Sequence, residues 1–359
     1  MRIAQLVPAL HPGDAIGNDA RTLSAYFQRN GISSAVFYLH ADPEVAAEGF
    51  PVSSYPEWIG DDAANVTILH YALPSPLNDR FARTAGRRIL VYHNITPSEF
   101  LQGYPHLQHL SREGRRALAE LRTIPCTAVA DSEYNRLELA AMGFADTRVI
   151  PIFIDFDRLN ESPCPVTLRM HRVEQMVTFL FVGRVTPNKC QHDVIRLYGV
   201  YKRAVNPRCR LFLVGKYDGF EPYLDRCRRA ADRFRLGDVH FVGRVTHREL
   251  LAYYHMADLF VSMSEHEGFG VPLVEAMHRG VPVMAYAAAA VPYTMGDAGI
   301  RFRQKSGMWL ELAHLAHLAA TDPVVRTRIL AGQTLRLEAF SMAHVARLWD
   351  AVLGASDLR

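Results

Sequence analysis

Short apolar runs alternate with helical patterns along the first 154 residues of the chain. The runs are RIAQLVPAL, SSAVFYLH, NVTILHY, RRILVYHN, CTAVADS and TRVIPIFI. Apolar runs of about four to eight residues that end in polar residues, glycine or proline are typical of buried strands. Since strands that alternate with helices form right-handed βαβ units, the pattern predicts a parallel sheet covered by helices.

A second series of the same kind follows a polar stretch, residues 155–176, in which we expect the linker between two domains. Its strand-like runs are TFLFVG, RLFLVG, VHFVG, LFVSMS and VPVMAY. Three of them end in a glycine followed by a cation: Gly183-Arg184, Gly215-Lys216 and Gly243-Arg244. The carboxyl ends of parallel strands share one edge of a sheet, and ligands bind there. Three cations at one edge favour an anionic ligand.

The hexapeptide FVGRVT occurs twice, at 181–186 and at 241–246. Each copy is a predicted strand end at this edge of the second sheet. We therefore expect both copies to face the same ligand.

Length and charge narrow the class of protein. A chain of 359 residues exceeds what one hydrophobic core usually supports, so we expect two domains. A net charge of +3 is too small to indicate nucleic-acid binding. The five cysteines show no C-x-x-C spacing, which predicts a reduced chain without disulfides or a zinc site. The first residues are typical of a strand and not of a signal peptide, and no apolar run is long enough to span a membrane, so we expect a cytoplasmic protein.

The most informative stretch is SEHEGFGVPLVEAMHRGVPVMAY, residues 264–286. Seven residues separate Glu267 from Glu275, and the first of them are Gly-Phe-Gly-Val-Pro. The proline and a later glycine predict a helix over 272–279 that ends at Gly280. Glycines before a helix let backbone N–H groups approach an anion. The two carboxylates suit hydroxyl groups, so the pattern favours a ligand with both phosphate and sugar.

This stretch resembles the Glu-seven-residues-Glu signature of retaining GT-B glycosyltransferases of family 4, the group 1 glycosyltransferases. Other stretches resemble the family as well: FVGRVTPNK, AYYHMADLFVSMSEHEGFGVPLVEAM, AVPYTMGDAGIRF, GDAIGND and VYHNITP. The resemblance implies an α/β protein with two Rossmann-like domains that face each other across a central cleft and close on the donor. It divides the chain into an acceptor domain (1–160), a nucleotide-sugar donor domain (161–338) and a helix that crosses back to the first domain (339–359).

The resemblance also implies the residues of the site. Arg184 and Lys189 would hold the diphosphate of the donor, and Glu267 would contact the transferred sugar. His93 would lie by the anomeric centre, although His70 also ends a predicted strand and competes with it. These four, His93, Glu267, Arg184 and Lys189, are the catalytic residues that we expect. The expected donor-binding residues are Gly17 in a loop near the phosphate, Ser132 at a helix start, Gly183, the base-pocket residues Gly243, Arg244 and Val245, the backbone of Gly268, Phe269, Gly270, Val271, Leu273 and Val274, and Glu275 on the ribose.

One departure from the family, one missing group and one competing motif bear on the expected site and mechanism. The family often has glycine where this chain has Cys190, so we expect the following helix to start differently. No carboxylate is well placed as a nucleophile, and the resemblance implies front-face attack without a metal or another cofactor. Asp155-Phe156-Asp157 matches the metal-binding Asp-x-Asp of the other major glycosyltransferase fold. Its place in the expected linker favours a helix-capping turn.

The predicted function is transfer of a hexose from a nucleotide-diphosphate sugar of the GDP-mannose or UDP-glucose type. The acceptor would be a saccharide or a lipid-linked saccharide in surface polysaccharide or glycolipid biosynthesis. A further hypothesis places SREGRRALAELR at the inner face of an anionic membrane, with no nucleic-acid partner. The alternatives are a non-catalytic basic surface that binds anionic lipid or RNA, and a nicotinamide-dependent oxidoreductase. The second lacks a G-x-G-x-x-G after any strand.

Overall fold

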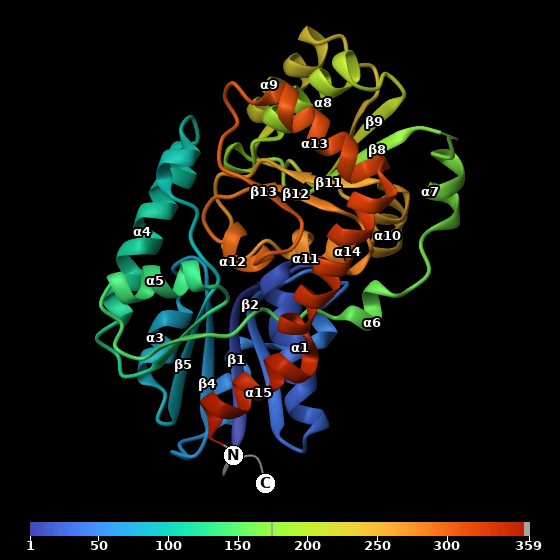
Figure 1. Cartoon of the computed structure of the whole chain (residues 1–359). Helices are drawn as coiled ribbons and strands as arrows, with labels where there is room; N and C mark the ends of the chain where they lie inside the picture. The colour runs from blue at the N-terminus through green and yellow to red at the C-terminus, as the bar shows by residue number, and fades with distance from the viewer. Residues whose placement is uncertain (174, 355–359) are drawn as a thin grey trace. The chain divides into compact units, whose positions relative to one another are not determined.

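The computed structural model describes residues 1–173 and 175–354, which form two compact units (Figure 1). The first unit comprises Met1–Ile154 together with the segment from Ala339 onward, and the second comprises Asp155–Glu338. The first boundary lies after Ile154, whereas the sequence predicted it after residue 160. The reason is local, since the residues after Ile154 bond within the second unit: Asn160 accepts a hydrogen bond from His278, and the Leu159 carbonyl accepts one from Arg279.

Unit 1 is a parallel sheet with the strand order β3-β2-β1-β4-β5-β6-β7. Its strands are β1 (Arg2–Leu10), β2 (Ser33–Ala41), β3 (Phe50–Pro51), β4 (Val66–Tyr71), β5 (Arg87–Tyr92), β6 (Thr127–Ala130) and β7 (Thr147–Val149). Its helices are α1 (Ala15–Arg29), α2 (Tyr55–Ile59), α3 (Leu77–Arg83), α4 (Pro105–Leu121), α5 (Glu133–Ala141) and α15 (Met342–Leu353). The predicted strands are present, and the order reverses between β1 and β4.

Unit 2 is a second parallel sheet with the order β10-β9-β8-β11-β12-β13. Its strands are β8 (Val177–Val182), β9 (Cys209–Val214), β10 (Val239–Gly243), β11 (Leu259–Ser262), β12 (Val283–Tyr286) and β13 (Ile300–Phe302). Its helices are α6 (Phe156–Leu159), α7 (Pro165–Met170), α8 (Gln191–Ala204), α9 (Glu221–Arg233), α10 (His247–Met256), α11 (Val271–His278), α12 (Val291–Met295), α13 (Trp309–Thr321) and α14 (Pro323–Leu337). The order reverses between β8 and β11, and ligands bind at such a switch point in doubly wound sheets.

The last helix, α15, belongs to the core of unit 1. Val345, Trp349 and Leu353 are buried in one apolar cluster with residues of β1, β4, β5 and α1. The ring of Trp349 meets the ring of Phe27 edge to face, with their centroids 6.2 Å apart. The hydroxyl of Tyr26 donates a hydrogen bond of 2.7 Å to Asp350. The unit 1 core is therefore completed by a segment that follows unit 2 in the chain.

Candidate functional site

Three Val-Gly strand ends lie side by side at the C-terminal edge of the unit 2 sheet. The amide of Gly183, after β8, donates to the carbonyl of Val214, and the amide of Gly215 donates to the carbonyl of Gly243. Gly215 has φ +150°, and a Cβ placed on it would lie 2.0 Å from the carbonyl oxygen of Gly183. The strand ends approach this closely because glycine has no side chain. The prediction that both FVGRVT copies reach the same sheet edge is confirmed.

The cations at this edge differ in their surroundings. Arg184 donates a hydrogen bond of 2.9 Å to the carbonyl of Asp218, and its guanidinium lies 4.9 Å from the ring centre of Phe220. Both contacts hold the side chain beside the end of β9. Arg244, in the second hexapeptide, is exposed, and Val245 beside it is partly buried. Thr246 and Glu249 form a capping box there that starts α10.

Lys189 and Glu267 contact each other next to the switch point. Lys189 ends the 3₁₀ turn Pro187–Lys189, which directly precedes α8. Glu267 lies in the loop between β11 and α11. The ammonium of Lys189 is 2.5 Å from a carboxylate oxygen of Glu267, and both side chains are largely buried, with exposed fractions of 21% and 14%. Two residues predicted to be catalytic, 78 positions apart, are thus brought together.

Asn188 ties the same two segments together through the backbone. Its carbonyl accepts a hydrogen bond of 2.8 Å from the amide of Glu265. Its side-chain amide donates to the carbonyl of His266, and its side-chain oxygen accepts from Thr186. The hydrogen bonds with Glu265 and His266 join the turn that carries Lys189 to the loop that carries Glu267. They therefore hold the backbone on both sides of the Lys189–Glu267 contact. Sequence reasoning did not assign Asn188, although it stands in the quoted FVGRVTPNK.

The loop after Glu267 enters α11 through a left-handed glycine. Gly270 has φ +91°, and a Cβ there would meet the side chain of Leu273 at 2.8 Å. Helix α11 covers residues 271–278, close to the predicted 272–279, and has Pro272 in its first turn. The side chains of Leu273 and Val274 are buried in the core, so only their backbone is available to a ligand. Phe269 is also buried, and its carbonyl accepts a hydrogen bond from Thr294.

Glu275, the second glutamate of the signature, lies one turn into α11. It accepts a hydrogen bond of 2.7 Å from the hydroxyl of Tyr254 in α10. Burial raises the pKa of Glu275, and the Tyr254 hydrogen bond opposes that shift. The tyrosine fixes one carboxylate oxygen and leaves the other available to accept. Sequence reasoning missed Tyr254, since nothing in its local pattern links it to a residue 21 positions away.

In unit 1, His93 follows β5 and His70 lies near the end of β4. The nitrogen Nδ1 of His70 is 2.9 Å from Nε2 of His93, and the rings are stacked with centroids 5.2 Å apart. Nε2 of His70 in turn bonds the side-chain oxygen of Gln5 at 2.9 Å. The two histidines that competed in the sequence are therefore parts of one cluster.

The pKa values of the two imidazoles are shifted in opposite directions. Asp131 lies 3.7 Å from Nδ1 of His93, and Asp19 lies 4.0 Å from Nδ1 of His70. Burial alone would lower the pKa of His93, but Asp131 and Asp19 outweigh it and the pKa is raised. Burial holds the pKa of His70 well below its usual value, and His93 lowers it further. Burial raises the pKa of Asp19 to about 6. His93 is thus the imidazole that carries a positive charge more readily.

The structure places two further expected residues of unit 1 at helix starts. Ser132 caps α5 by accepting a hydrogen bond from the amide of Asn135, as its sequence position predicted. The loop predicted at Gly17 is wrong. Gly17 lies in the first turn of α1, where its amide donates to the side chain of the capping residue Asp14. A Cβ at Gly17 would lie 3.1 Å from Leu10, so its small size permits close packing of the helix against β1.

Comparison with known proteins identifies the second unit. Residues 171–329 match the model of the family described as glycosyl transferases group 1. The chain carries a group 1 glycosyl transferase domain. This domain contains the whole arrangement of Arg184, Lys189, Glu267 and Glu275.

Two relatives extend the likeness. O-antigen chain mannosyltransferase B of Escherichia coli is 25% identical over 222 residues, which cover 60% of this chain and 56% of the relative. The GDP-mannose-dependent alpha-(1-6)-phosphatidylinositol monomannoside mannosyltransferase of Mycobacterium tuberculosis is 29% identical over 176 residues, covering 46% of this chain and 44% of the relative. The chain thus spans about half the length of these relatives.

Solved structures match the fold of this chain over nearly its full length. HepE of Anabaena, crystallised with UDP-glucose, has a TM-score of 0.72 and 20% identity over 98% of this chain and 99% of its own. Sucrose-phosphate synthase of Thermosynechococcus elongatus has a TM-score of 0.75 and 17% identity over 98% of both chains. The predicted GT-B fold class, with two Rossmann-like units, is confirmed.

Two motifs that competed with the glycosyl transferase interpretation have structural explanations. Asp155 accepts a hydrogen bond of 2.9 Å from the amide of Arg158 and caps α6, as predicted. In SREGRRALAELR, Arg115 pairs with Glu138, and Arg116 pairs with two glutamates of its own helix, α4. These pairs compensate much of the positive charge that suggested a basic surface. Within the described ranges, 1–173 and 175–354, no helix is long and apolar enough to cross a membrane.

Proposed function

We propose that the protein is a retaining glycosyltransferase of family 4 that moves a hexose from a nucleotide-diphosphate sugar to a saccharide or lipid-linked saccharide. The observation that carries the proposal is the contact between Lys189 and Glu267 at the switch point of the donor unit. A cation and a carboxylate beside a glycine-rich helix start suit a ligand that joins phosphate to a hydroxyl-bearing sugar.

The contact also suggests how the donor enters. A diphosphate is a stronger partner for an ammonium than one carboxylate is, so Lys189 turns to the phosphates when the donor binds. Glu267 is then released to accept hydrogen bonds from the sugar hydroxyls. Arg184, in the same connection between β8 and α8 as Lys189, supplies the second cation. The backbone of residues 268–274, Pro272 excepted, supplies N–H donors. Glu275 holds the ribose through the oxygen that Tyr254 leaves open.

The base pocket is assigned to the second hexapeptide. Gly183 and Gly243 lie at the same sheet edge, at the ends of β8 and β10 on either side of β9, and Arg244 and Val245 follow Gly243. The side chain of Arg244 is exposed and makes no hydrogen bond or ion pair with other described residues. We therefore assign base recognition mainly to the backbone groups of Gly243, Arg244 and Val245.

The proposed chemistry needs no metal. Arg184, Lys189 and the α11 N-terminus stabilise the charge that develops on the departing diphosphate. The acceptor attacks the face from which the diphosphate leaves, and a leaving phosphate oxygen takes the acceptor proton, so the anomeric configuration is retained. No side chain is assigned as general base. His93, whose pKa Asp131 and Asp19 raise against the effect of burial, is assigned to the anomeric centre, where an imidazole that accepts a proton more readily favours the leaving diphosphate.

The relatives support mannose as the first sugar to test. One is an O-antigen chain mannosyltransferase and another is a GDP-mannose-dependent mannosyltransferase that acts on a phosphatidylinositol mannoside. HepE, crystallised with UDP-glucose, supports UDP-glucose as the second. We propose a role in bacterial surface polysaccharide or glycolipid assembly, in the cytoplasm, with peripheral contact to the inner face of the membrane.

Calorimetric titration tests the donor. GDP, UDP, GDP-mannose and UDP-glucose are titrated into the protein in the presence of a metal chelator. The proposal expects one diphosphate to bind more tightly than the other, and a sugar nucleotide of that base to be consumed when a saccharide acceptor is added. Absence of binding by every one of the four ligands would contradict the proposed function.

A further inference from the structure

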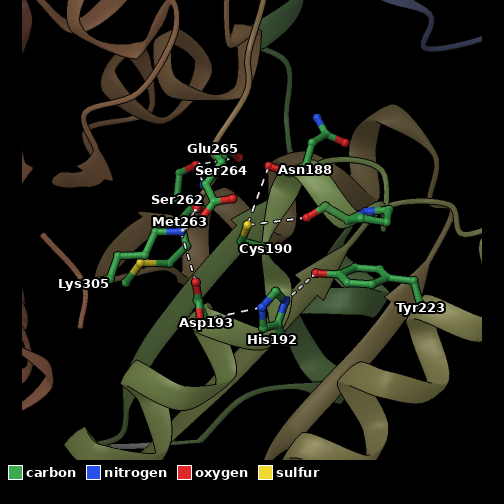
Figure 2. Close-up of polar contacts among 11 residues, drawn as sticks. Asn188, Cys190, His192, Asp193, Tyr223, Ser262, Met263, Ser264, Glu265 and Lys305 are labelled. Atoms are coloured by element: carbon green, nitrogen blue, oxygen red, sulfur yellow. Dashed lines mark hydrogen bonds and ion pairs between the residues drawn. The ribbon is translucent and has the colours of Figure 1, made fainter. Parts of the chain in front are cut away.

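A second lysine, Lys305, reaches the loop that carries Glu267. Lys305 follows β13, and its ammonium donates to the carbonyl of Met263 at 2.9 Å, to Glu265 at 3.0 Å and to Asp193 at 3.0 Å. Figure 2 shows its side chain between α8 and the 263–265 loop. An ammonium has three N–H groups and no acceptor, so these three contacts satisfy it completely.

The Lys305 ammonium is largely buried among groups that favour a positive charge. Its side chain is 10% exposed, and its ammonium lies 4.4 Å from the ring centre of Tyr286. Cys190, Asp193 and Glu265 bring one thiol and two carboxylate oxygens within 4.8 Å of one another. Carboxylates at this separation repel unless a cation lies near them. Lys305 supplies that cation.

Both segments that Lys305 joins lead to the proposed catalytic contact. Glu265 is two residues before Glu267, and Asp193 is four residues after Lys189. His192 supports the α8 side of the cluster, since it bonds the hydroxyl of Tyr223 at 2.8 Å and lies 3.8 Å from Asp193. Asn188 joins the same segments by backbone hydrogen bonds, and Lys305 joins them by charge.

We infer that Lys305 is a positioning residue that holds Glu267 in place for sugar transfer. The inference rests on the proposed function. Lys305 does not contact the donor in this scheme; it acts through the loop. A misplacement of about 1 Å can lower a rate by about a hundredfold, so loss of this anchor is expected to reduce turnover more than donor binding.

Lys202 offers a matched control. Its ammonium contacts Asp238 and the carbonyl of Pro207, and its side chain is 25% exposed. Like Lys305 it is a paired lysine of unit 2, but it lies in the last turn of α8, far along the helix from Lys189. Lys202→Met therefore removes a lysine with comparable partners and leaves the proposed site intact.

The first measurement is hydrogen exchange of the 262–270 segment in ligand-free protein. We expect Lys305→Met to speed exchange there by about tenfold, because the loop loses its anchor, while Lys202→Met leaves it unchanged. Equal exchange in wild type and Lys305→Met would overturn the inference. Hydrogen exchange is measured without enzymatic activity, so it tests whether Lys305 anchors the loop even if the proposed function is wrong.

The second measurement is steady-state transfer with the donor found by titration. Lys305→Met should lower kcat by about ten- to a hundredfold and change the KM for the donor by less than about threefold. Glu265→Gln removes the negative charge at one end of the anchor, on an exposed residue, and should act in the same direction if Lys305→Met does not fold. An active wild type with unchanged kcat in both variants would overturn the positioning role and leave the proposed function standing. An inactive wild type would count against the proposed function alone.

Discussion

At the scale of residues, lysine usage is informative. The chain holds four lysines and 36 arginines, yet two of the four lysines end on carboxylates of the loop between β11 and α11. Lysine presents a compact point charge with three donors, whereas arginine presents a planar fork. Three acceptors around one atom, as at Lys305, suit the ammonium. With so few lysines in the sequence, both Lys189 and Lys305 stand out as candidates for specific contacts.

The two arginines of the repeated hexapeptide are predicted to differ in importance. Arg184→Ala should lower kcat/KM by about a hundredfold, since it removes a cation placed at the developing diphosphate charge. Arg244→Ala should change kcat/KM by less than about fivefold, because that side chain is exposed and base recognition is assigned to backbone. Initial rates over a range of donor concentrations measure both. Equal losses in the two variants would contradict this division.

The histidine pair makes a prediction about protonation. His93 should titrate above the usual histidine pKa of about 6.5, while His70 stays neutral. Asp131→Asn removes the nearest carboxylate and should lower the pKa of His93. NMR titration of histidine side-chain signals measures this shift, with His93→Asn for assignment and Asp146→Asn as a control elsewhere in unit 1. A pKa of His93 that does not change in Asp131→Asn would show that its charge is not set by this carboxylate.

The sign for stability follows from the direction of the His93 shift. A histidine with a raised pKa in the folded protein contributes stability that is fully present below its unfolded pKa, about 6.5. That contribution is lost as pH rises through the folded pKa. Asp19, raised to about 6, acts in the same sense, because its protonated form is favoured in the folded protein and stability falls as pH rises from about 4 towards 6.

The family resemblance predicted part of the site. It pointed to Lys189 and Glu267, and the fold brings them into contact. The competition between His70 and His93 was an artefact of treating each strand end alone, since parallel pairing of β4 and β5 places them in one cluster. Tyr254, Asn188 and Lys305 were not assigned, because each acts on a partner more than 20 positions away and no local pattern encodes that distance.

At the scale of elements, the strand-to-loop turns carry the site. Apolar runs located the strands of both sheets except β3 and β13, which have only two and three residues. Cys190 is the more specific case. It occupies the position where the family often has glycine, and it adopts φ +52° directly before α8. A left-handed φ favours glycine and is uncommon for other residues, so the turn before α8 imposes on Cys190 a conformation that glycine adopts more easily.

The close approach of the backbone after β8 and β9 predicts that a glycine there is sensitive to substitution. Gly215→Ala would place a methyl group 2.0 Å from the carbonyl oxygen of Gly183, so the strand ends must separate. We expect a loss of roughly 2–4 kcal/mol in the free energy of unfolding of unit 2. Gly237→Ala is the control, because a Cβ there has no neighbour within 4 Å. Chemical denaturation followed by circular dichroism measures both, and equal stability of the two variants would contradict the packing.

At the scale of the whole molecule, the chain forms two α/β units. Unit 1 is built from two separate parts of the chain, whereas unit 2 is one continuous segment. Length and the two strand series predicted the two units, and the family resemblance supplied the returning helix. Periodicity alone could show that α15 is amphipathic, but not that Trp349 packs on Phe27, because the apolar faces of helices are chemically alike.

The proposed glycosyltransferase activity is tested most directly by measuring sugar transfer by the Glu267→Ala variant. Wild type is expected to form a glycoside from the nucleotide sugar that it binds, and Glu267→Ala is expected to lose about a hundredfold or more of that rate while its circular dichroism spectrum and melting temperature stay close to wild type. Glu311→Ala, an exposed glutamate in the first turn of α13, should keep full activity. A correctly folded Glu267→Ala variant with the transfer rate of wild type would contradict the account.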